Sequence, residues 1–209
     1  MSQSAPARRT QQRAIETRRS LLETAIEVFS TRGFDGISIR QIEEQAGVKR
    51  GLVGYHFGDK DSLWREAADQ LFGALADDFV TRLEALAEVS PAEAARGVVR
   101  AFVRYSAEHP ELNRLMMQES VADSWRVAYI VEEKIRPLLD TLYATMPEAA
   151  RLLWGDRDPH RYYLFIGAGA FVFSAEQECR RLFGTAPRSA DFIERHTNMM
   201  VQLLMGSTT

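Results

Sequence analysis

The sequence predicts an all-α fold, and three observations support this prediction. Apolar residues recur at the spacing of amphipathic helices over most of the 209 residues. Residues that favour helix starts, such as Ser38, Asp59 and the pair Ser90-Pro91, stand in front of these segments. No segment of useful length alternates apolar and polar residues, as a half-buried strand would.

The amino-terminal segment predicts an arm followed by a first helix. Residues 1 to 12 are rich in Ser, Gln, Pro and Arg, and this composition predicts a flexible basic arm. A first helix is expected from about Gln12 to Thr31, ending near Gly33 because glycine often terminates helices. Its apolar face consists of Leu22, Ala25, Ile26 and Phe29.

Residues 38 to 57 predict two short helices joined by a tight glycine turn. Ser38 and Gln41 have the S-x-x-Q spacing of a capping box, in which each side chain satisfies a backbone N–H of the other residue. Gly47 follows at the point where a left-handed cap is needed, a conformation that glycine adopts at low cost. The apolar face of the first of these helices consists of Ile39, Ile42 and Ala46.

The second short helix is expected to open with two cations and to bury Val48, Leu52 and Phe57. Its outer side or end would then carry Lys49, Arg50, Gly51, Gly54, Tyr55 and His56. Each glycine weakens a helix by about 1 kcal/mol, so two glycines favour a face that something bulky approaches. A short basic helix held rigidly on another suits the major groove of DNA. Paired helices of this kind also occur in all-α proteins that never bind DNA.

The remaining helices follow from start and stop signals. Asp59 is expected to cap a helix that reaches about Leu86 and links the two halves of the chain, and Ser90-Pro91 starts another that ends at Glu108. His109-Pro110 interrupts the pattern, and Gly155 to Pro159 reads as a loop. Further helices are predicted over Glu111 to Val121, Ser124 to Met146, Pro159 to Phe183 and Ser189 to Leu204.

Charge is distributed unevenly along the chain. The formal net charge is −3, but residues 1–60 contain ten Lys or Arg against seven Asp or Glu, whereas residues 61–209 contain sixteen against twenty-two. A basic end on an acidic body produces a field that attracts phosphate at one end only. The single cysteine, Cys179, excludes an intrachain disulfide. Because no apolar leader opens the chain and the longest apolar run is too short for a bilayer, a cytoplasmic protein is expected.

The segment from about Arg13 to Trp64 resembles the TetR family of transcriptional regulators. The residues that carry the resemblance are the apolar face of the first helix, Gly33-Phe34, Ser38-Ile39-Arg40-Gln41-Ile42, Ala46-Gly47-Val48, Gly51, Tyr55-His56-Phe57 and Lys60. The resemblance implies a helix-turn-helix DNA-binding domain over residues 13–60 and a larger helical ligand-binding and dimerisation domain over residues 61–209. It also implies a dimeric repressor that a small, partly apolar molecule releases from its operator, with no cofactor.

The resemblance further implies which residues contact DNA. It assigns phosphate contacts to Ser38, Tyr55, His56 and Lys60, and base-edge or backbone contacts to Arg40, Lys49, Arg50 and Gly51. Gly54 stands where the family very often has tyrosine, so Arg50 is expected to carry more of the base readout, through paired hydrogen bonds to guanine.

The second half predicts a ligand pocket and a dimer interface. Pockets for small molecules are mostly apolar with a few polar groups, and the candidate lining residues are Phe102, Tyr105, Met116, Met117, Glu119, Trp125, Tyr129, Tyr162 and Phe165. His109 is a further polar candidate. The segment from Pro159 is apolar on nearly every side in its first half, which favours either a central core helix or cover by a second subunit. The resemblance implies a homodimer through the last two helices.

Three alternatives to a ligand-responsive repressor require different sequence or structural features. The four histidines are scattered without a metalloprotease pattern, and no glycine-rich phosphate loop follows a strand, so the sequence argues against an enzyme. A metal-responsive regulator would need His109 and Glu111 to act as ligands. An effector-independent DNA-binding regulator would have a completely filled second domain.

Overall fold

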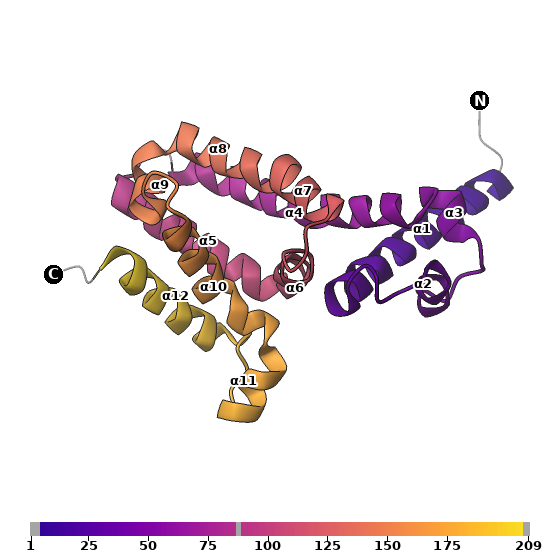
Figure 1. The fold of residues 1–209 in the computed structure, drawn as a ribbon. Helices are drawn as coiled ribbons and strands as arrows, with labels where there is room; N and C mark the ends of the chain where they lie inside the picture. The colour runs from indigo at the N-terminus through magenta and orange to yellow at the C-terminus, as the bar shows by residue number, and fades with distance from the viewer. Residues whose placement is uncertain (1–4, 87–88, 207–209) are drawn as a thin grey trace. The chain divides into compact units, whose positions relative to one another are not determined.

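The structure is a computed structural model that describes residues 5–86 and 89–206, with side chains described in these ranges except at residues 5–9, 80 and 83–85. The described residues form helices and no strand, which confirms the all-α fold class (Figure 1). The chain divides into two compact units, Met1–Leu71 and Phe72–Thr209. Over the described ranges, no helix combines the length and the apolar character needed to cross a membrane.

The first unit contains α1 (Ala5–Arg32), α2 (Ile39–Gln45), α3 (Leu52–Phe57) and the beginning of α4 (Lys60–Leu86). Helix α1 begins at Ala5 rather than at Gln12, because Ala, Arg and Gln favour helices and Pro6 is tolerated in the first turn. Residues 5–12 of the predicted arm are therefore helical, while residues 1–4 lie outside the described residues.

Local capping fixes the bounds of α2. The Ser38 hydroxyl accepts a hydrogen bond from the Gln41 backbone N–H at 3.3 Å, and the Gln41 side chain accepts one from the Ser38 backbone N–H at 2.9 Å. The predicted capping box is thus confirmed. Gly47 has a φ of +68°, the left-handed conformation expected after this helix.

Helix α3 starts later than predicted. Lys49 and Arg50 lie in the turn before the helix, and Gly51, with a φ of +87°, is its N-cap. The prediction that two cations open this helix is therefore wrong, because a residue in the left-handed region cannot be part of an α-helix. The new start also corrects the buried face, since Val53 and Phe57 are buried while Val48 and Leu52 are only half-buried.

The second unit contains the end of α4 and the helices that follow it. These are α5 (Pro91–Glu108), α6 (Pro110–Glu119), α7 (Trp125–Ile130), the π-helix η1 (Val131–Ile135), α8 (Arg136–Thr145), α9 (Pro147–Trp154), α10 (Pro159–Ser174), α11 (Glu176–Phe183) and α12 (Ala190–Met205). Helix α5 packs against α6, α9, α10 and α12, and its fully buried residues include Ala95, Val99 and Val103.

Three features of this unit differ from the prediction. Helix α9 was not expected, although Pro147 occupies a favourable position in its first turn. The helix predicted over 159–183 is divided at Ala175, whose φ of −92° and ψ of +29° leave the helical region. The helix predicted over 124–146 contains the π-helical turn η1, a feature that often occurs at functional sites.

Candidate nucleic-acid interface and ligand cavity

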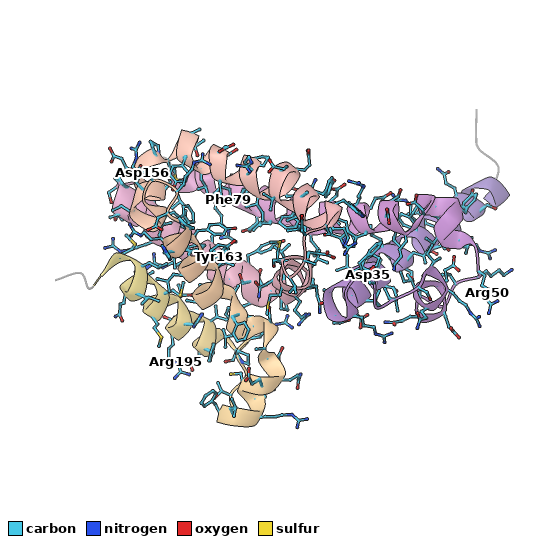
Figure 2. All side chains as sticks on the ribbon, in the orientation of Figure 1. Asp35, Arg50, Phe79, Asp156, Tyr163 and Arg195 are labelled. Atoms are coloured by element: carbon cyan, nitrogen blue, oxygen red, sulfur yellow. The ribbon has the colours of Figure 1, made fainter. Side chains whose placement is uncertain are left out.

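The turn between α2 and α3 presents a basic, exposed surface. The side chains of Arg40, Lys49 and Arg50 are exposed, and Figure 2 shows Arg50 extending away from the ribbon. Tyr55, on the outer side of α3, is 77% exposed. A methyl group added at Gly54 would meet no atom within 4 Å, so the backbone of α3 is accessible at that point. The surface therefore offers cations and open backbone to an approaching polyanion.

A buried carboxylate fixes the angle between α2 and α3. Glu43, in α2, is only 3% exposed, and its Oε1 accepts a hydrogen bond of 2.9 Å from the backbone N–H of Val53. This N–H belongs to the first turn of α3, where backbone donors have no partner within the helix. The role of Glu43 could not be predicted from the sequence, because a glutamate in an amphipathic helix is ordinarily a solvated residue.

Helices α1 and α4 support this pair of helices. The guanidinium group of Arg18, in α1, forms an ion pair with Glu66 of α4 and lies 4.8 Å from the centre of the Phe57 ring in α3. The Ser20 hydroxyl donates a hydrogen bond of 3.3 Å to the carbonyl of Ala46, at the end of α2. Helix α1 thus contacts both helices of the pair, and its Arg18 is in turn held by α4.

The residues expected to contact phosphate lie in different environments. Ser38 is exposed at the start of α2, and its hydroxyl is part of the capping box. His56 is half-buried, with its ring 4.9 Å from that of Tyr55. The ammonium group of Lys60 donates a hydrogen bond of 2.6 Å to the Phe34 carbonyl and lies 4.1 Å from the centre of the Phe34 ring. Lys60 therefore stabilises the connection between α1 and α2 in this structure.

The second unit contains a partly open cavity of about 150 Å³. An apolar cavity of this size holds a small organic molecule. It is lined by Phe72, Leu75, Asp78, Phe79, Val98, Ala101, Phe102, Tyr105, Ser106, His109, Leu112, Asn113, Met116, Ile135, Leu138, Leu139, Leu142, Trp154, Tyr162, Phe165, Ile166 and Ala170.

Part of the predicted ligand site lies on the wall of this cavity, namely Phe102, Tyr105, Met116, Tyr162 and Phe165, together with His109. The other predicted residues, Met117, Glu119, Trp125 and Tyr129, are not among the described lining residues. Met117 is exposed, and Glu119 is buried in an ion pair of 2.7 Å with Arg126. The ring of Tyr129 lies 5.1 Å from the ammonium group of Lys134.

Sequence reasoning missed the contributions of α4 and of the segment from η1 to α8. Phe72, Leu75, Asp78 and Phe79 line the cavity from α4, and Ile135, Leu138, Leu139 and Leu142 line it from the other segment. Their spacing is that of any buried helical face, so no sequence signal separates cavity-lining residues from core residues. Asp78 was detectable in principle, as a carboxylate on an otherwise apolar face of α4.

Polar groups gather on the part of the wall formed by α4, the end of α5 and the start of α6. Both carboxylate oxygens of Asp78 bind Arg82, each at 2.8 Å. Burial raises the pKa of the Tyr105 hydroxyl well above its usual range, and the negative charges of Glu111 and Asp78 raise it further. The ring of His109 is tilted by 34° against that of Tyr105, with ring centres 4.5 Å apart, and its Nδ1 lies 3.2 Å from a carboxylate oxygen of Glu111.

Trp154, which is one of the lining residues, carries a buried polar atom without a partner. This residue is 4% exposed, and its indole N–H has no hydrogen-bond partner among the described residues. An unpaired buried donor costs about 1–3 kcal/mol.

Helices α10 and α12 leave large apolar side chains uncovered. Tyr163, Leu164 and Phe171 of α10 are exposed, as are Met199 and Leu203 of α12. Gly167 lies between the α10 residues and a methyl group added to it would meet no atom within 4 Å. The two helices pack on each other, and the imidazole of His196 in α12 forms a hydrogen bond of 2.9 Å to the Ala168 carbonyl. Exposed apolar area of this kind marks interaction surfaces.

Two family models match the chain. Residues 21–67 match the model of bacterial regulatory proteins of the tetR family, and residues 91–204 match that of the tetracycline-repressor-like C-terminal domain. The second match covers more than half of the chain. The first covers α2, the turn and α3, and the second covers the helices from α5 to α12.

Curated relatives match over part of their length. The HTH-type transcriptional repressor AcnR of Corynebacterium efficiens is 33% identical over 97 residues, which are 46% of this chain and 47% of the relative. The HTH-type transcriptional regulator AcrR of Shigella flexneri is 43% identical over 60 residues, 29% of this chain and 28% of the relative. The regulator RutR of Escherichia coli K12 is 29% identical over 106 residues, 50% and 48% of the two chains. The matched segments thus span about half or less of these relatives.

Solved structures match over nearly the whole chain. A TetR-like transcriptional regulator from Rhodococcus sp. RHA1 has a TM-score of 0.59 at 18% identity, covering 90% of this chain and 93% of that one. A member of the TetR transcriptional regulator family from Streptomyces coelicolor has a TM-score of 0.55 at 20% identity, covering 90% and 91%. At this level of identity, the likeness concerns the fold.

Proposed function

Because the chain belongs to the TetR family of bacterial regulatory proteins, we propose that it is a sequence-specific DNA-binding transcriptional regulator. In this proposal a dimer represses transcription from its operator, and a small, largely apolar effector releases it. The observation that carries the proposal is the exposed cationic turn before α3, held rigidly by the buried bond between Glu43 and Val53. A regulator of this kind acts on the bacterial chromosome, and hence in the cytoplasm.

We assign DNA recognition to residues 13–60 and regulation to residues 61–209. Arg50 is proposed to read bases, because it is exposed at the tip of the turn and a guanidinium group pairs with guanine through two hydrogen bonds. Arg40, Lys49 and Tyr55 are proposed to bind phosphates from the same surface, together with Ser38, Gly51 and His56. Lys60 is proposed to act mainly through its bond to Phe34.

The dimer is proposed to form through α10 and α12. The exposed residues Tyr163, Leu164 and Phe171 of α10 and Met199 and Leu203 of α12 would form this surface. The same surface of a second copy would pack against it across a two-fold axis. Gly167 favours this arrangement, since a small residue lets a partner helix approach closely. Two copies of the DNA-binding surface would then read two half-sites of an operator.

Effector binding is proposed to act through α4. This helix starts at Lys60, in the first unit, and its residues Phe72, Leu75 and Phe79 line the cavity in the second. An effector that fits the cavity better in one position of α4 would change the population of the DNA-binding arrangement. Such a molecule releases the operator only if it binds the released form more tightly.

The rival regulators receive less support. The cavity argues against a completely filled, effector-independent second domain. His109 and Glu111 are neighbours, but the described residues contain no group of three His, Cys, Asp or Glu side chains placed to hold a metal ion. The family consists of transcriptional regulators, and nothing in the described geometry favours an enzyme over this function.

Selection of bound duplexes from a random pool tests the proposal. The full-length protein is expected to enrich a sequence with two-fold related half-sites, and Arg50→Ala is expected to relax the preference at one position in each half-site. Loss of one good paired contact to guanine corresponds to about 1–3 kcal/mol of discrimination. Failure to enrich any sequence would overturn the proposed function.

A further inference from the structure

The cavity wall has two chemically distinct parts. Seven of its residues are Phe, Tyr or Trp; of these, Phe79, Trp154 and Phe165 are buried and Phe102 is half-buried. The rings of Phe102 and Phe165 are 4.5 Å apart, and those of Trp154 and Phe165 are 5.0 Å apart. The remaining wall is mostly aliphatic, except for the polar groups near Tyr105.

The polar part of the wall includes a carboxylate and has a second one close behind it. Asp78 lies on the wall, and Glu111 contacts the wall residue His109. Glu108, the last residue of α5, acts electrostatically on Arg82, which is itself paired with Asp78. The guanidinium group of Arg188 also lies at the end of α5, where it donates a hydrogen bond of 2.8 Å to the Ala107 carbonyl. The negative charge that faces the cavity is therefore that of Asp78 on the wall, with Glu111 behind His109.

The Tyr105 hydroxyl reports the same field. Its pKa is raised first by burial and then by the charges of Glu111 and Asp78, so two carboxylates act on an atom of the wall itself. The described lining residues include Asp78 but no lysine or arginine. Negative charge and aromatic ring faces both attract cations and disfavour anions.

We propose that the cavity binds an organic cation with an apolar body, the charged head lying near Asp78 and Tyr105 and the body lying among the aromatic rings. The proposed function is needed only to identify this cation as the effector of a regulator. The binding preference itself is a property of the cavity. It excludes carboxylates and phosphates as preferred ligands.

Three probes with an octyl or octanoyl chain and different head groups are compared, namely octyltrimethylammonium, 1-octanol and octanoate. Because their apolar parts are similar, differences in their affinity report the effect of the head-group charge. Their binding to the full-length protein is measured by calorimetry, below the concentrations at which they form micelles. The ammonium compound is expected to bind about tenfold or more tightly than octanoate, with octanol between them. Equal or tighter binding of octanoate, or no binding of the ammonium compound, would overturn the proposal.

Two aspartates of α4 provide a matched pair of variants. Asp78→Asn is expected to reduce the preference for the ammonium compound over octanoate by about fivefold or more, because the charge at the wall is lost. Asp77→Asn makes the same change at an exposed residue that is not among the lining residues, and the preference is expected to remain. An unchanged preference in Asp78→Asn would contradict the proposed position of the head.

Loss of the Arg82 partner could impair folding of Asp78→Asn, so Glu111→Gln serves as a second variant. It is expected to lower the same preference by a smaller factor, since Glu111 lies behind His109. Operator affinity measured without any probe tests the proposed function separately. A protein that binds the ammonium compound but shows no operator would refute the regulator and leave the ligand class standing.

Discussion

Glu43 and Glu44 are neighbours in α2, yet their environments are opposite. Glu43 is buried and accepts a hydrogen bond from the backbone of α3, whereas Glu44 is exposed. Similar contrasts distinguish other single residues of this protein. His196 is half-buried between α10 and α12, while His160 is exposed at the start of α10.

Glu43→Ala is expected to destabilise the first unit by about 1–3 kcal/mol, because the Val53 N–H loses its buried acceptor. Amide hydrogen exchange at Val53 and thermal unfolding measure the effect, and operator affinity should fall with it. Glu44→Ala is the control and should change stability by less than about 0.5 kcal/mol. Equal effects of the two substitutions would show that the buried bond contributes nothing.

His196 predicts a pH dependence of stability. Burial lowers its pKa in the folded protein, against the opposing effect of its hydrogen bonds to the backbone of α10. The unfolded chain therefore binds a proton more readily, and stability should fall as the pH drops below about 6.5. His196→Gln should flatten this part of the curve of melting temperature against pH. His160→Gln should leave it unchanged, and an identical flattening by both would contradict the assignment.

At the scale of elements, helix starts were the most predictable features. Ser38, Asp59 and Ser90 were expected to cap helices, and each accepts the local backbone hydrogen bond that such a cap makes. These bonds involve residues three positions apart, so the sequence alone contains both partners. The start of α3 was misplaced, because the left-handed conformation of Gly51 moves it past the two cations.

Features that depend on tertiary packing were not predictable in the same way. The bond between Lys60 and Phe34 joins residues from different elements, and no local pattern announces it. The cavity was anticipated only in part, since Phe102 and Phe165 follow the spacing of core residues, as Leu138 and Leu142 also do. Apolar side chains around a cavity and in a filled core have the same chemistry, and only their arrangement in space separates them.

The two glycines of the turn and α3 should respond oppositely to alanine. Gly51→Ala places a side chain at a φ of +87° and is expected to cost about 1 kcal/mol or more. Gly54→Ala lies within α3 in open space, so it should stabilise the helix by about 0.5–1 kcal/mol and yet weaken DNA binding by covering the backbone. Thermal unfolding and fluorescence anisotropy measure the two effects. Stronger DNA binding by Gly54→Ala would contradict the proposed approach of DNA to α3.

For the whole molecule, charge and exposed apolar surface are segregated. Residues 1–60 are basic while the remainder is acidic, so the net charge of −3 conceals a DNA-binding end. The large exposed apolar residues of the second unit occur mainly on α10, α11 and α12. This distribution agrees with one end for DNA and one face for a second copy.

Leu203→Glu is expected to convert the dimer to a monomer, because a carboxylate would be buried without a partner in the proposed interface. Sedimentation velocity at micromolar concentration measures the change, and operator affinity should fall with dimerisation. Leu152→Glu alters an exposed leucine of α9 and should leave the dimer intact. A Leu203→Glu protein that remains fully dimeric would place the interface elsewhere.

The salt dependence of DNA binding tests the central claim, that the turn and α3 seat in duplex DNA. The full-length protein is titrated into the selected duplex and into a shuffled duplex of the same composition, at several salt concentrations. The account predicts tighter binding of the selected duplex by about a thousandfold or more, and a linear fall of log affinity with log salt that becomes shallower in Lys49→Ala. Equal affinity for the two duplexes at low salt would contradict it.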